Sequence, residues 1–206
     1  MVIFNERLAE FVGIMLGDGY ISYPKTPRIK ISLDSIVDKD YLSYVHTLLE
    51  EIFGCNIILE NRKTENTSNL FIFNRDVIRS IINEIGLIPS PKWDRAIIPT
   101  WIFQKHFEKQ VLRGYFDTDG CVVRTNNNGT LYPRLEMKIS PSPMQKQFIK
   151  ILSDLGFRFK AYNIGKGKVR IQINGKEELR KWCSLVGFSN AKHASKANFF
   201  LNTQQL

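Results

Sequence analysis

The sequence contains few of the residues that build disulfide frameworks and zinc sites. Its 206 residues include only three cysteines, which lie far apart and form no CxxC pair. The three histidines, His46, His106 and His193, are equally scattered. This pattern argues against a disulfide-rich fold and against a zinc centre, because both need such residues at close, regular spacing. We expect each histidine to be a packed or surface residue.

Long hydrophobic segments are also absent from the sequence. No stretch is apolar for long enough to cross a bilayer. The first 20 residues carry Glu6, Arg7, Glu10 and Asp18 and lack a small-residue cleavage site, so they do not resemble a signal peptide. We therefore expect an intracellular protein, in the cytoplasm or inside an organelle, with no membrane partner.

Acidic residues are scarce in the second half of the chain. Residues 1–105 hold 12 basic and 13 acidic side chains, a net charge of −1, whereas residues 106–206 hold 17 basic and 7 acidic side chains, a net charge of +10. Concentrated positive charge favours a polyanionic partner, because neutralising phosphates releases their condensed counterions. On charge alone, a basic protein with no nucleic-acid role remains equally open.

The sequence repeats itself with an offset of 101 residues, since FVGIMLGDG at 11–19 corresponds to LRGYFDTDG at 112–120. Four further pairs follow in the same order: RIKIS and EMKIS (28–32, 136–140), EEIFG and SDLGF (50–54, 153–157), FIFN and IQIN (71–74, 171–174), and EIGLIPSPK and LVGFSNAK (84–92, 185–192). We predict two repeats, 1–104 and 105–206. No Gly- or Ser-rich linker separates them, so we expect them to pack as one unit.

Each repeat is predicted to follow the order helix, strand, strand, helix, strand, strand, helix, which is an α+β fold. Apolar residues recur at helical spacing after Asn5, a suitable N-cap, and again over about 38–53 and 76–85. The second repeat matches with helices near 105–118, 143–155 and 176–186. The strands alternate apolar and polar residues, which predicts one face in the core and one open face.

Basic side chains dominate these predicted open faces. A solvated sheet face would also carry polar residues, but here they are mostly Arg and Lys and rarely Glu. An antiparallel ribbon with such side chains can enter the major groove of DNA and hydrogen-bond to base edges. The candidate DNA-binding residues are Arg28, Lys30, Arg134, Lys138, Arg158, Lys160, Lys168, Arg170 and Gln172.

The first helix of each repeat carries, along one side, a stripe of mostly small residues spaced by four positions. Each of these helices is followed by Asp-Gly. The stripes are Ala9, Gly13 and Gly17, and Gln110, Gly114 and Thr118. Glycine inside a helix costs about 1 kcal/mol relative to alanine, and close packing of the two helices would offset this. Such packing would bring Asp18 and Asp119 together, with Gly19 and Gly120 as left-handed caps.

Two carboxylates at two helix C-termini repel each other and face the negative ends of the helix dipoles. A cation between them would relieve both effects, and carboxylate oxygens suit Mg²⁺. A single Asp-Gly after a helix is more often a turn than a site. Two copies at a matched offset favour a site.

These segments resemble the LAGLIDADG motif, and the chain resembles a single-chain, two-repeat LAGLIDADG homing endonuclease over essentially its full length. The resemblance implies that the motif helices form the central interface and that a four-stranded antiparallel sheet on either side makes a saddle for DNA. It implies site-specific, metal-dependent cleavage of both strands of a long double-stranded target, leaving short 3′ overhangs. Two repeats supply both half-sites, so we expect a monomer that needs no protein partner.

The resemblance also assigns a metal site, for Mg²⁺ or alternatively Mn²⁺. In the family the last acidic residue of each motif binds the metal, here Asp18 and Asp119. The backbone carbonyl just before each acid contributes as well, here from Gly17 and Thr118. An earlier acidic position of the motif, which is not a metal ligand, is Asp117 in the second copy and is replaced by leucine in the first.

Two lysines complete the expected site. Family members keep a lysine in the loop before the last helix of each repeat, and the matching positions are Lys92 and Lys192. A lysine there would polarise the scissile phosphate or adjust the pKa of a water molecule. An ordinary surface lysine is the alternative at both positions.

Three other functions share parts of this pattern. They are an intron-encoded RNA maturase of the same fold, a DNA-binding protein without catalytic activity, and an αβ protein with a coincidental repeat. Retention of Asp18 and Asp119 favours the endonuclease over the inactive binder. Mg²⁺-dependent DNA cleavage would separate it from a maturase. We see no splicing-type ends, so we expect a free-standing protein and not part of an intein.

Overall fold

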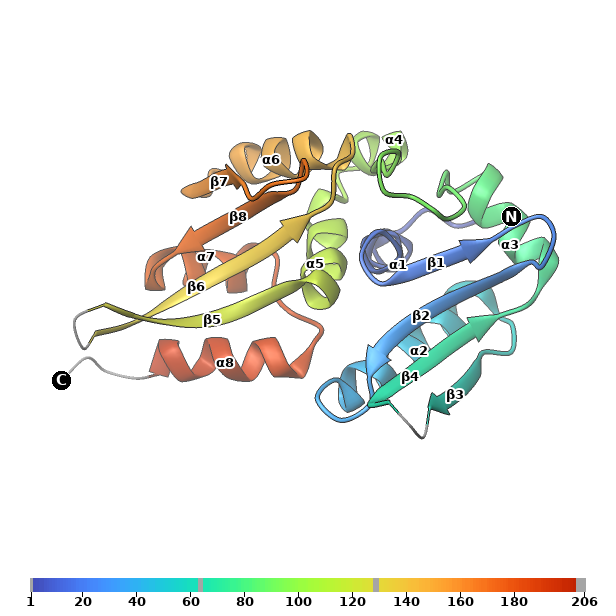
Figure 1. Cartoon of the computed structure of the whole chain (residues 1–206), viewed down its shortest axis with the longest axis horizontal. Helices are drawn as coiled ribbons and strands as arrows, with labels where there is room; N and C mark the ends of the chain where they lie inside the picture. Colours follow the sequence, from blue (N-terminus) through green and yellow to red (C-terminus); the bar gives the residue numbers. More distant parts are fainter. Residues whose placement is uncertain (1, 63–64, 128–129, 203–206) are drawn as a thin grey trace.

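The computed structural model describes residues 2–62, 65–127 and 130–202 and shows two similar halves (Figure 1). The first contains α1 (Glu6–Leu16), β1 (Gly19–Ser22), β2 (Arg28–Asp34), α2 (Lys39–Phe53), β3 (Ile58–Arg62), β4 (Thr67–Ile72) and α3 (Arg75–Asn83). The second contains α5 (Glu108–Asp119), β5 (Gly120–Asn127), β6 (Thr130–Ile139), α6 (Met144–Asp154), β7 (Phe159–Asn163), β8 (Val169–Asn174) and α7 (Lys176–Leu185). Two further helices, α4 (Thr100–Gln104) and α8 (Ala191–Asn202), lie outside the predicted pattern.

Each half has a four-stranded antiparallel sheet, and the two sheets share one topology. Their strand orders are β1-β2-β4-β3 and β5-β6-β8-β7. In β2, Ile29, Ile31 and Leu33 are buried while Arg28 is exposed, as the alternation predicts. The α+β fold of two αββαββα repeats is therefore confirmed.

The strand register corrects one detail of the sequence alignment. Gly19 pairs with Ile31, and Gly120 pairs with Met137, so Ile31 and Met137 are equivalent. The segment at 28–32 therefore matches 134–138, and not EMKIS at 136–140. A shift of two residues leaves every side chain on the same face of a strand, so the apolar alternation alone could not detect it.

The two sheets lie on either side of α1 and α5, which pack against each other at the centre of the molecule (Figure 1). Helices cover one face of each sheet, as α7 and α8 do where they contact β6. The opposite faces are open. Among the described residues, no helix has both the length and the apolar character needed to cross a membrane.

Backbones meet directly where α1 crosses α5. A Cβ atom added to Gly13 would lie 2.2 Å from the carbonyl oxygen of Val111, and one added to Gly114 would lie 2.2 Å from that of Glu10. One added to Gly17 would lie 2.1 Å from Oγ1 of Thr118. Real Cβ atoms do not approach this closely, so the predicted close contact along these stripes is confirmed.

A buried ion pair crosses the same interface. Arg113 Nη2 of α5 donates to Glu10 Oε2 of α1 at 2.5 Å, and Glu10 is only 1% exposed. A buried charge without its partner is strongly destabilising. The pair therefore adds a polar constraint on how the two helices align.

The ends of the helices follow local sequence signals. Asn5 caps α1, because its side chain accepts a hydrogen bond from the backbone N–H of Leu8 at 2.9 Å. Helix α8 buries His193, Ala197 and Phe200, a spacing of four and three residues that is typical of a helix packed on one side. That spacing is visible in the sequence, so α8 could have been predicted from it.

Replacing Gly13 with alanine should separate α1 from α5. We expect Gly13→Ala to lower the free energy of unfolding by about 2–3 kcal/mol, because added atoms in a close-packed contact force the backbone apart. Chemical denaturation measures this loss. The control is Gly54→Asn, where φ is +56° and nothing lies within 4 Å of an added Cβ. Equal losses for the two variants would contradict the backbone contact.

Candidate active site

The two predicted aspartates lie where α1 and α5 end beside each other. Asp119 is the last residue of α5, and Asp18 follows Gly17, which caps α1. A Cβ on Gly17 would lie 3.1 Å from Oδ2 of Asp119, so the two helix ends are in contact. The packing of α1 against α5 along these stripes therefore places the two carboxylates close together.

The glycines after these aspartates do not form left-handed caps, which corrects our expectation. Neither is among the described glycines with positive φ, and Gly120 is extended, with φ −97° and ψ 170°. Gly19 and Gly120 are needed instead because a side chain at either position would collide with the preceding helix. A Cβ on Gly19 would lie 2.5 Å from the Cα of Met15, and one on Gly120 would lie 2.5 Å from the carbonyl oxygen of Phe116. Each glycine lets a strand begin directly against its motif helix.

Burial makes both carboxylates hard to ionise, and repulsion from Asp119 adds to this effect at Asp18. Burial is the main cause that raises the pKa of Asp18 from 3.8 to about 7, and the charge of Asp119 adds to it. Burial also raises the pKa of Asp119. Lys92 opposes both shifts. The site therefore has a deficit of positive charge that a divalent cation would remove.

Lys92 reaches this site from the loop between α3 and α4. Its ammonium donates to the backbone carbonyls of Met15, Gly17 and Gly19, at 2.5, 2.7 and 2.8 Å. An ammonium has three protons, so this arrangement uses all of them. Burial lowers the pKa of Lys92 to about 8, against the attraction of Asp119 and Asp18. The lysine therefore neutralises the negative end of α1.

This lysine occupies one expected metal ligand, the Gly17 carbonyl. A carbonyl oxygen has two lone pairs, so it can accept from Lys92 and still offer one to a cation. The Thr118 side chain donates to the carbonyls of Gly114 and Tyr115, at 3.2 and 3.0 Å. The metal-binding roles of Gly17 and Thr118 stay predictions.

The residues present fit a magnesium-type ion. Within the described part of the chain, no group of three or more His, Cys, Asp and Glu side chains is placed to hold a metal. The protein donors would be the carboxylates of Asp18 and Asp119 with backbone oxygens. Mg²⁺ is commonly bound by one or two carboxylates while it keeps several waters.

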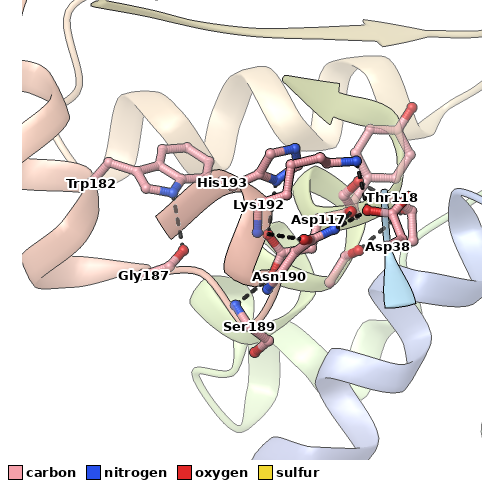
Figure 2. A network of polar contacts seen from close by, with 11 residues as sticks. Asp38, Asp117, Thr118, Trp182, Gly187, Ser189, Asn190, Lys192 and His193 are labelled. Carbon is pink, nitrogen blue, oxygen red and sulfur yellow. Dashed lines mark hydrogen bonds and ion pairs between the residues drawn. The ribbon is translucent and has the colours of Figure 1, made fainter. Parts of the chain in front are cut away.

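Lys192 differs from Lys92, and its expected place in a loop is wrong. It lies in the first turn of α8 and pairs through Nζ with Asp38 Oδ1 at 2.6 Å (Figure 2). Asp38 belongs to the first repeat, just before α2. The ion pair therefore joins the two repeats beside the site.

A second set of contacts fixes the turn that carries Lys192. Asp117 Oδ2 accepts from the backbone N–H groups of Ser189 and Asn190, at 2.6 and 3.1 Å, and the Asn190 side chain donates to Asp38 at 2.8 Å (Figure 2). His193 Nδ1 lies 3.2 Å from Asp117 Oδ1, and both residues are at most 2% exposed. His193 is thus a packed residue, as expected. The earlier acidic position of the motif is structural here.

A cleft of about 300 Å³ opens beside Asp119. Its walls include Lys92, Trp93 and Lys138. The Trp93 side chain is 64% exposed. Two lysines, Lys92 and Lys138, beside the Asp119 carboxylate provide positive charge where a phosphate could approach. Trp93 and Asp38 are site residues that the repeat comparison did not identify.

The predicted DNA-binding residues fall into two groups. Lys138, Lys160, Arg134 and Arg170 lie on the open face of the second sheet, on neighbouring strands. In the first sheet, Arg28 is exposed and the Lys30 ammonium lies 5.9 Å from the centre of the Tyr20 ring. Lys168 directly precedes β8. These positions are compatible with a nucleic-acid interface, and the contacts themselves stay predictions.

Four members of this set contact carboxylates within the protein, and two of them, Arg134 and Arg170, pair with Glu136. Arg158 pairs with Glu177 and Glu178, at 2.6 and 2.7 Å, so its charge is already neutralised. Gln172 is only 8% exposed and donates to Glu136 Oε2 at 2.9 Å. Glu136 is an exception to the expected predominance of Arg and Lys on these faces, and it lies at the centre of the second one.

The sequence model of the LAGLIDADG DNA endonuclease family matches residues 10–179. The chain belongs to this family. The matched span contains Asp18, Lys92 and Asp119 and ends before Lys192.

Three similar proteins place the family match in context. A replication factor C small subunit from Methanocaldococcus jannaschii is 24% identical over 198 residues, which are 94% of this chain and 10% of that protein. The homing endonuclease I-WcaI, bound to its DNA recognition sequence, has a TM-score of 0.60 at 15% identity, covering 100% of this chain and 89% of that one. I-DmoI in complex with DNA and Mn has a TM-score of 0.54 at 13% identity, covering 89% and 97%. This chain thus spans about a tenth of the curated relative, and the two structures share its LAGLIDADG fold.

The raised pKa of Asp18 predicts an unusual dependence of stability on pH without metal. Because the folded-state value of about 7 exceeds the ordinary 3.8, the folded protein binds this proton more tightly, and stability present near pH 4 is lost as pH rises through 7. Asp18→Asn should remove this loss, which raises the free energy of unfolding at pH 8 by about 1–3 kcal/mol. Denaturation in EDTA between pH 4 and 8 measures it.

The control for this variant is Asp94→Asn, because the Asp94 side chain is 85% exposed. We expect its pH profile to follow that of the unmodified protein. A profile for Asp18→Asn that is as steep as the control would contradict the electrostatic description of the site.

The bridge between Asp38 and Lys192 can be tested by a double-mutant cycle. Asp38→Ala, Lys192→Ala and the double variant should give a coupling free energy of about 1–3 kcal/mol, because the two side chains touch in a partly buried place. The matched control is the exposed pair Lys150–Asp154, whose 2.7 Å separation is similar. That pair should couple by about 0.5 kcal/mol or less. Equal couplings would reject the bridge.

Proposed function

We propose that this protein is a site-specific endonuclease that hydrolyses phosphodiester bonds on both strands of a long double-stranded DNA target. The observation that carries the proposal is the meeting of Asp18 and Asp119 at the contact between α1 and α5, between two sheets with open faces. Family membership supports DNA cleavage as the reaction. Short 3′ overhangs remain part of the proposal from the family resemblance.

The proposed cofactor is a divalent cation, Mg²⁺ or alternatively Mn²⁺. Asp18 and Asp119 would hold it, together with the backbone carbonyls of Gly17 and Thr118. When bound, such an ion lowers the pKa of water and stabilises the leaving oxygen. Burial and, after it, repulsion from Asp119 raise the pKa of Asp18, and a bound cation would offset both effects. I-DmoI, a protein of the same fold that is described in complex with DNA and Mn, also supports this assignment.

The two lysines have different proposed tasks. Lys92 orients the end of α1 through its three carbonyl contacts and offers positive charge at the wall of the cleft near Asp119. Lys192 is held by Asp38, so its ammonium stays beside the site. Both would stabilise negative charge that develops on the scissile phosphate.

The open sheet faces are the proposed DNA-binding surface, a saddle across the central helices. Lys138, Lys160, Arg134 and Arg170 give the second sheet its positive charge. The first sheet carries fewer of the predicted basic residues, namely Arg28 and Lys30. Because the second sheet carries more positive charge, we expect the second repeat to contribute more phosphate contacts. Each phosphate that it neutralises releases counterions and so favours binding.

We further propose that residues 1–104 and 105–206 act as one unit and bind both half-sites without a second chain. An intracellular location, needed to reach DNA, belongs to the same proposal. A maturase or an inactive DNA-binding protein is the competing outcome of the experiment below.

A cleavage selection tests the proposal. Purified protein is incubated with a randomised plasmid library in Mg²⁺, and the ends of linearised molecules are sequenced. We expect one long consensus, cut on both strands. Removal of an outer-shell partner of a metal ligand lowers activity by roughly 10- to 100-fold. Asp18→Asn and Asp119→Asn should each lower the cleavage activity by more than this. Asp94→Asn, the same change at an exposed side chain, should cleave normally.

The other outcomes identify the alternatives. DNA that is enriched on pulldown in Ca²⁺ but never cleaved would indicate a binding protein without catalysis. No selection of DNA under either condition would reject the endonuclease and favour RNA binding. Full activity in both Asp18→Asn and Asp119→Asn would place the chemistry elsewhere.

A further inference from the structure

A carboxylate lies at the centre of the basic face of the second sheet. Glu136 is on β6, where it pairs in register with Cys121 of β5 and Gln172 of β8. Its side chain is only 9% exposed, although it lies on the face that the helices leave open. Removing a carboxylate from water is unfavourable unless charged or hydrogen-bonding partners replace the water. The surroundings of Glu136 must therefore supply such partners.

Two arginines and a hydrogen-bonded amide supply them. Arg134 Nε lies 3.3 Å from Glu136 Oε2, and Arg170 Nε lies 3.2 Å from Oε1. Gln172 Nε2 donates to Oε2 at 2.9 Å, and the Gln172 Oε1 atom accepts from the Tyr162 hydroxyl. One carboxylate thus forms ion pairs, without hydrogen-bond geometry at either Nε, with two guanidinium groups that would otherwise repel each other across neighbouring strands.

The guanidinium atom that contacts Glu136 determines which hydrogen-bond donors of each arginine remain available to a ligand. Both arginines approach through Nε, and within the described residues their terminal Nη atoms have no hydrogen-bond or ion-pair partner. The side chains of Arg134 and Arg170 are 26% and 34% exposed. Their Nη groups are therefore free to donate two parallel hydrogen bonds outward.

The equivalent place in the first sheet has the opposite charge. The strand registers make Lys30 the counterpart of Glu136, since each lies one residue before the partner of its motif glycine. Lys30 pairs in register with Phe71 where Glu136 pairs with Gln172. The acidic centre is thus a property of the second sheet and not of the repeated fold.

We propose that Glu136 is a positioning residue that presents Arg134 and Arg170 as a fixed pair of guanine readers. This inference rests on the proposed function, in which the open face of the second sheet binds DNA, and it places the strands of that face in the major groove, which an antiparallel ribbon can enter. There, an arginine donates two hydrogen bonds to O6 and N7 of guanine, the commonest specific contact to a base. Glu136 acts through the arginines, because its buried oxygens are already occupied. The half-site under this sheet should require guanine at two positions.

Base preference measured by the cleavage selection tests this proposal. The unmodified protein should discriminate for guanine at two positions in one half-site, each by roughly 5- to 150-fold. Glu136→Gln keeps the size of the side chain and an amide contact to Gln172 but removes the charge. Discrimination at both positions should fall by roughly 10-fold. Non-specific DNA affinity in Ca²⁺ should rise, because a negative charge has left the interface.

Opposite changes in specificity and non-specific affinity distinguish positioning from damage to the fold, which would lower both. Arg170→Lys keeps the charge but loses the two-pronged contact, so it should relax only one of the two positions. The matched control is Glu60→Gln, an exposed glutamate on β3 of the first sheet that lies 3.8 Å from Arg62. It should leave both guanine preferences unchanged.

Three results would overturn the inference. They are an absence of guanine preference in the unmodified protein, an unchanged preference in Glu136→Gln, and a preference lost equally in Glu60→Gln. Each of these can occur in a protein that cleaves specifically, so the proposed function would survive. An unmodified protein that selects no DNA would reject both together.

Discussion

The direct contact of α1 and α5 is the constraint on which the other features depend. Gly13 and Gly114 allow the two backbones to touch, since neither position has room for even one more carbon atom. Because the contact continues to Gly17 and Thr118, the ends of the two helices arrive side by side. The sheets are attached to these ends, because β1 and β5 begin at Gly19 and Gly120. One contact thus sets the distance between the carboxylates and the placement of both open faces.

That contact creates an electrostatic problem, which the two repeats solve differently. Two helix C-termini and two carboxylates concentrate negative charge in a partly buried place. In the first repeat Lys92 binds carbonyls of its own motif helix. In the second repeat Lys192 reaches across to Asp38. The pseudo-symmetric fold therefore contains two unequal half-sites, and the sheets differ in the same way, with Lys30 and Glu136 in equivalent places.

Much of the fold followed from the sequence because the repeat provided a second, independent copy of each signal. The stripes of small residues predicted the helix contact, and the strand alternation predicted which faces are buried. Helix α8 was not predicted although His193, Ala197 and Phe200 have helical spacing, because the aligned segments of the two repeats end at Lys192, in the first turn of this helix. The alignment of β2 with β6 was wrong by two residues, a shift that the period of a strand conceals.

The site was less predictable, because its charges are paired across distant parts of the chain. Nothing near Asp38 in the sequence indicates that it binds Lys192, which lies in the other repeat. The pairing of Arg158 with Glu177 and Glu178 depends on how α7 packs beside β7. Gly19 and Gly120 were assigned a left-handed conformation from their type alone. The structure uses their small size instead, a choice that depends on the neighbouring helix.

The central claim is that the helix contact builds one shared cation site from both repeats. The most direct test is a crystal structure with the selected target DNA and Mn²⁺, in which anomalous scattering locates the ion. We predict density within bonding distance of carboxylate oxygens from both Asp18 and Asp119. Ion density bound by only one of these aspartates, or located away from the ends of α1 and α5, would contradict the account.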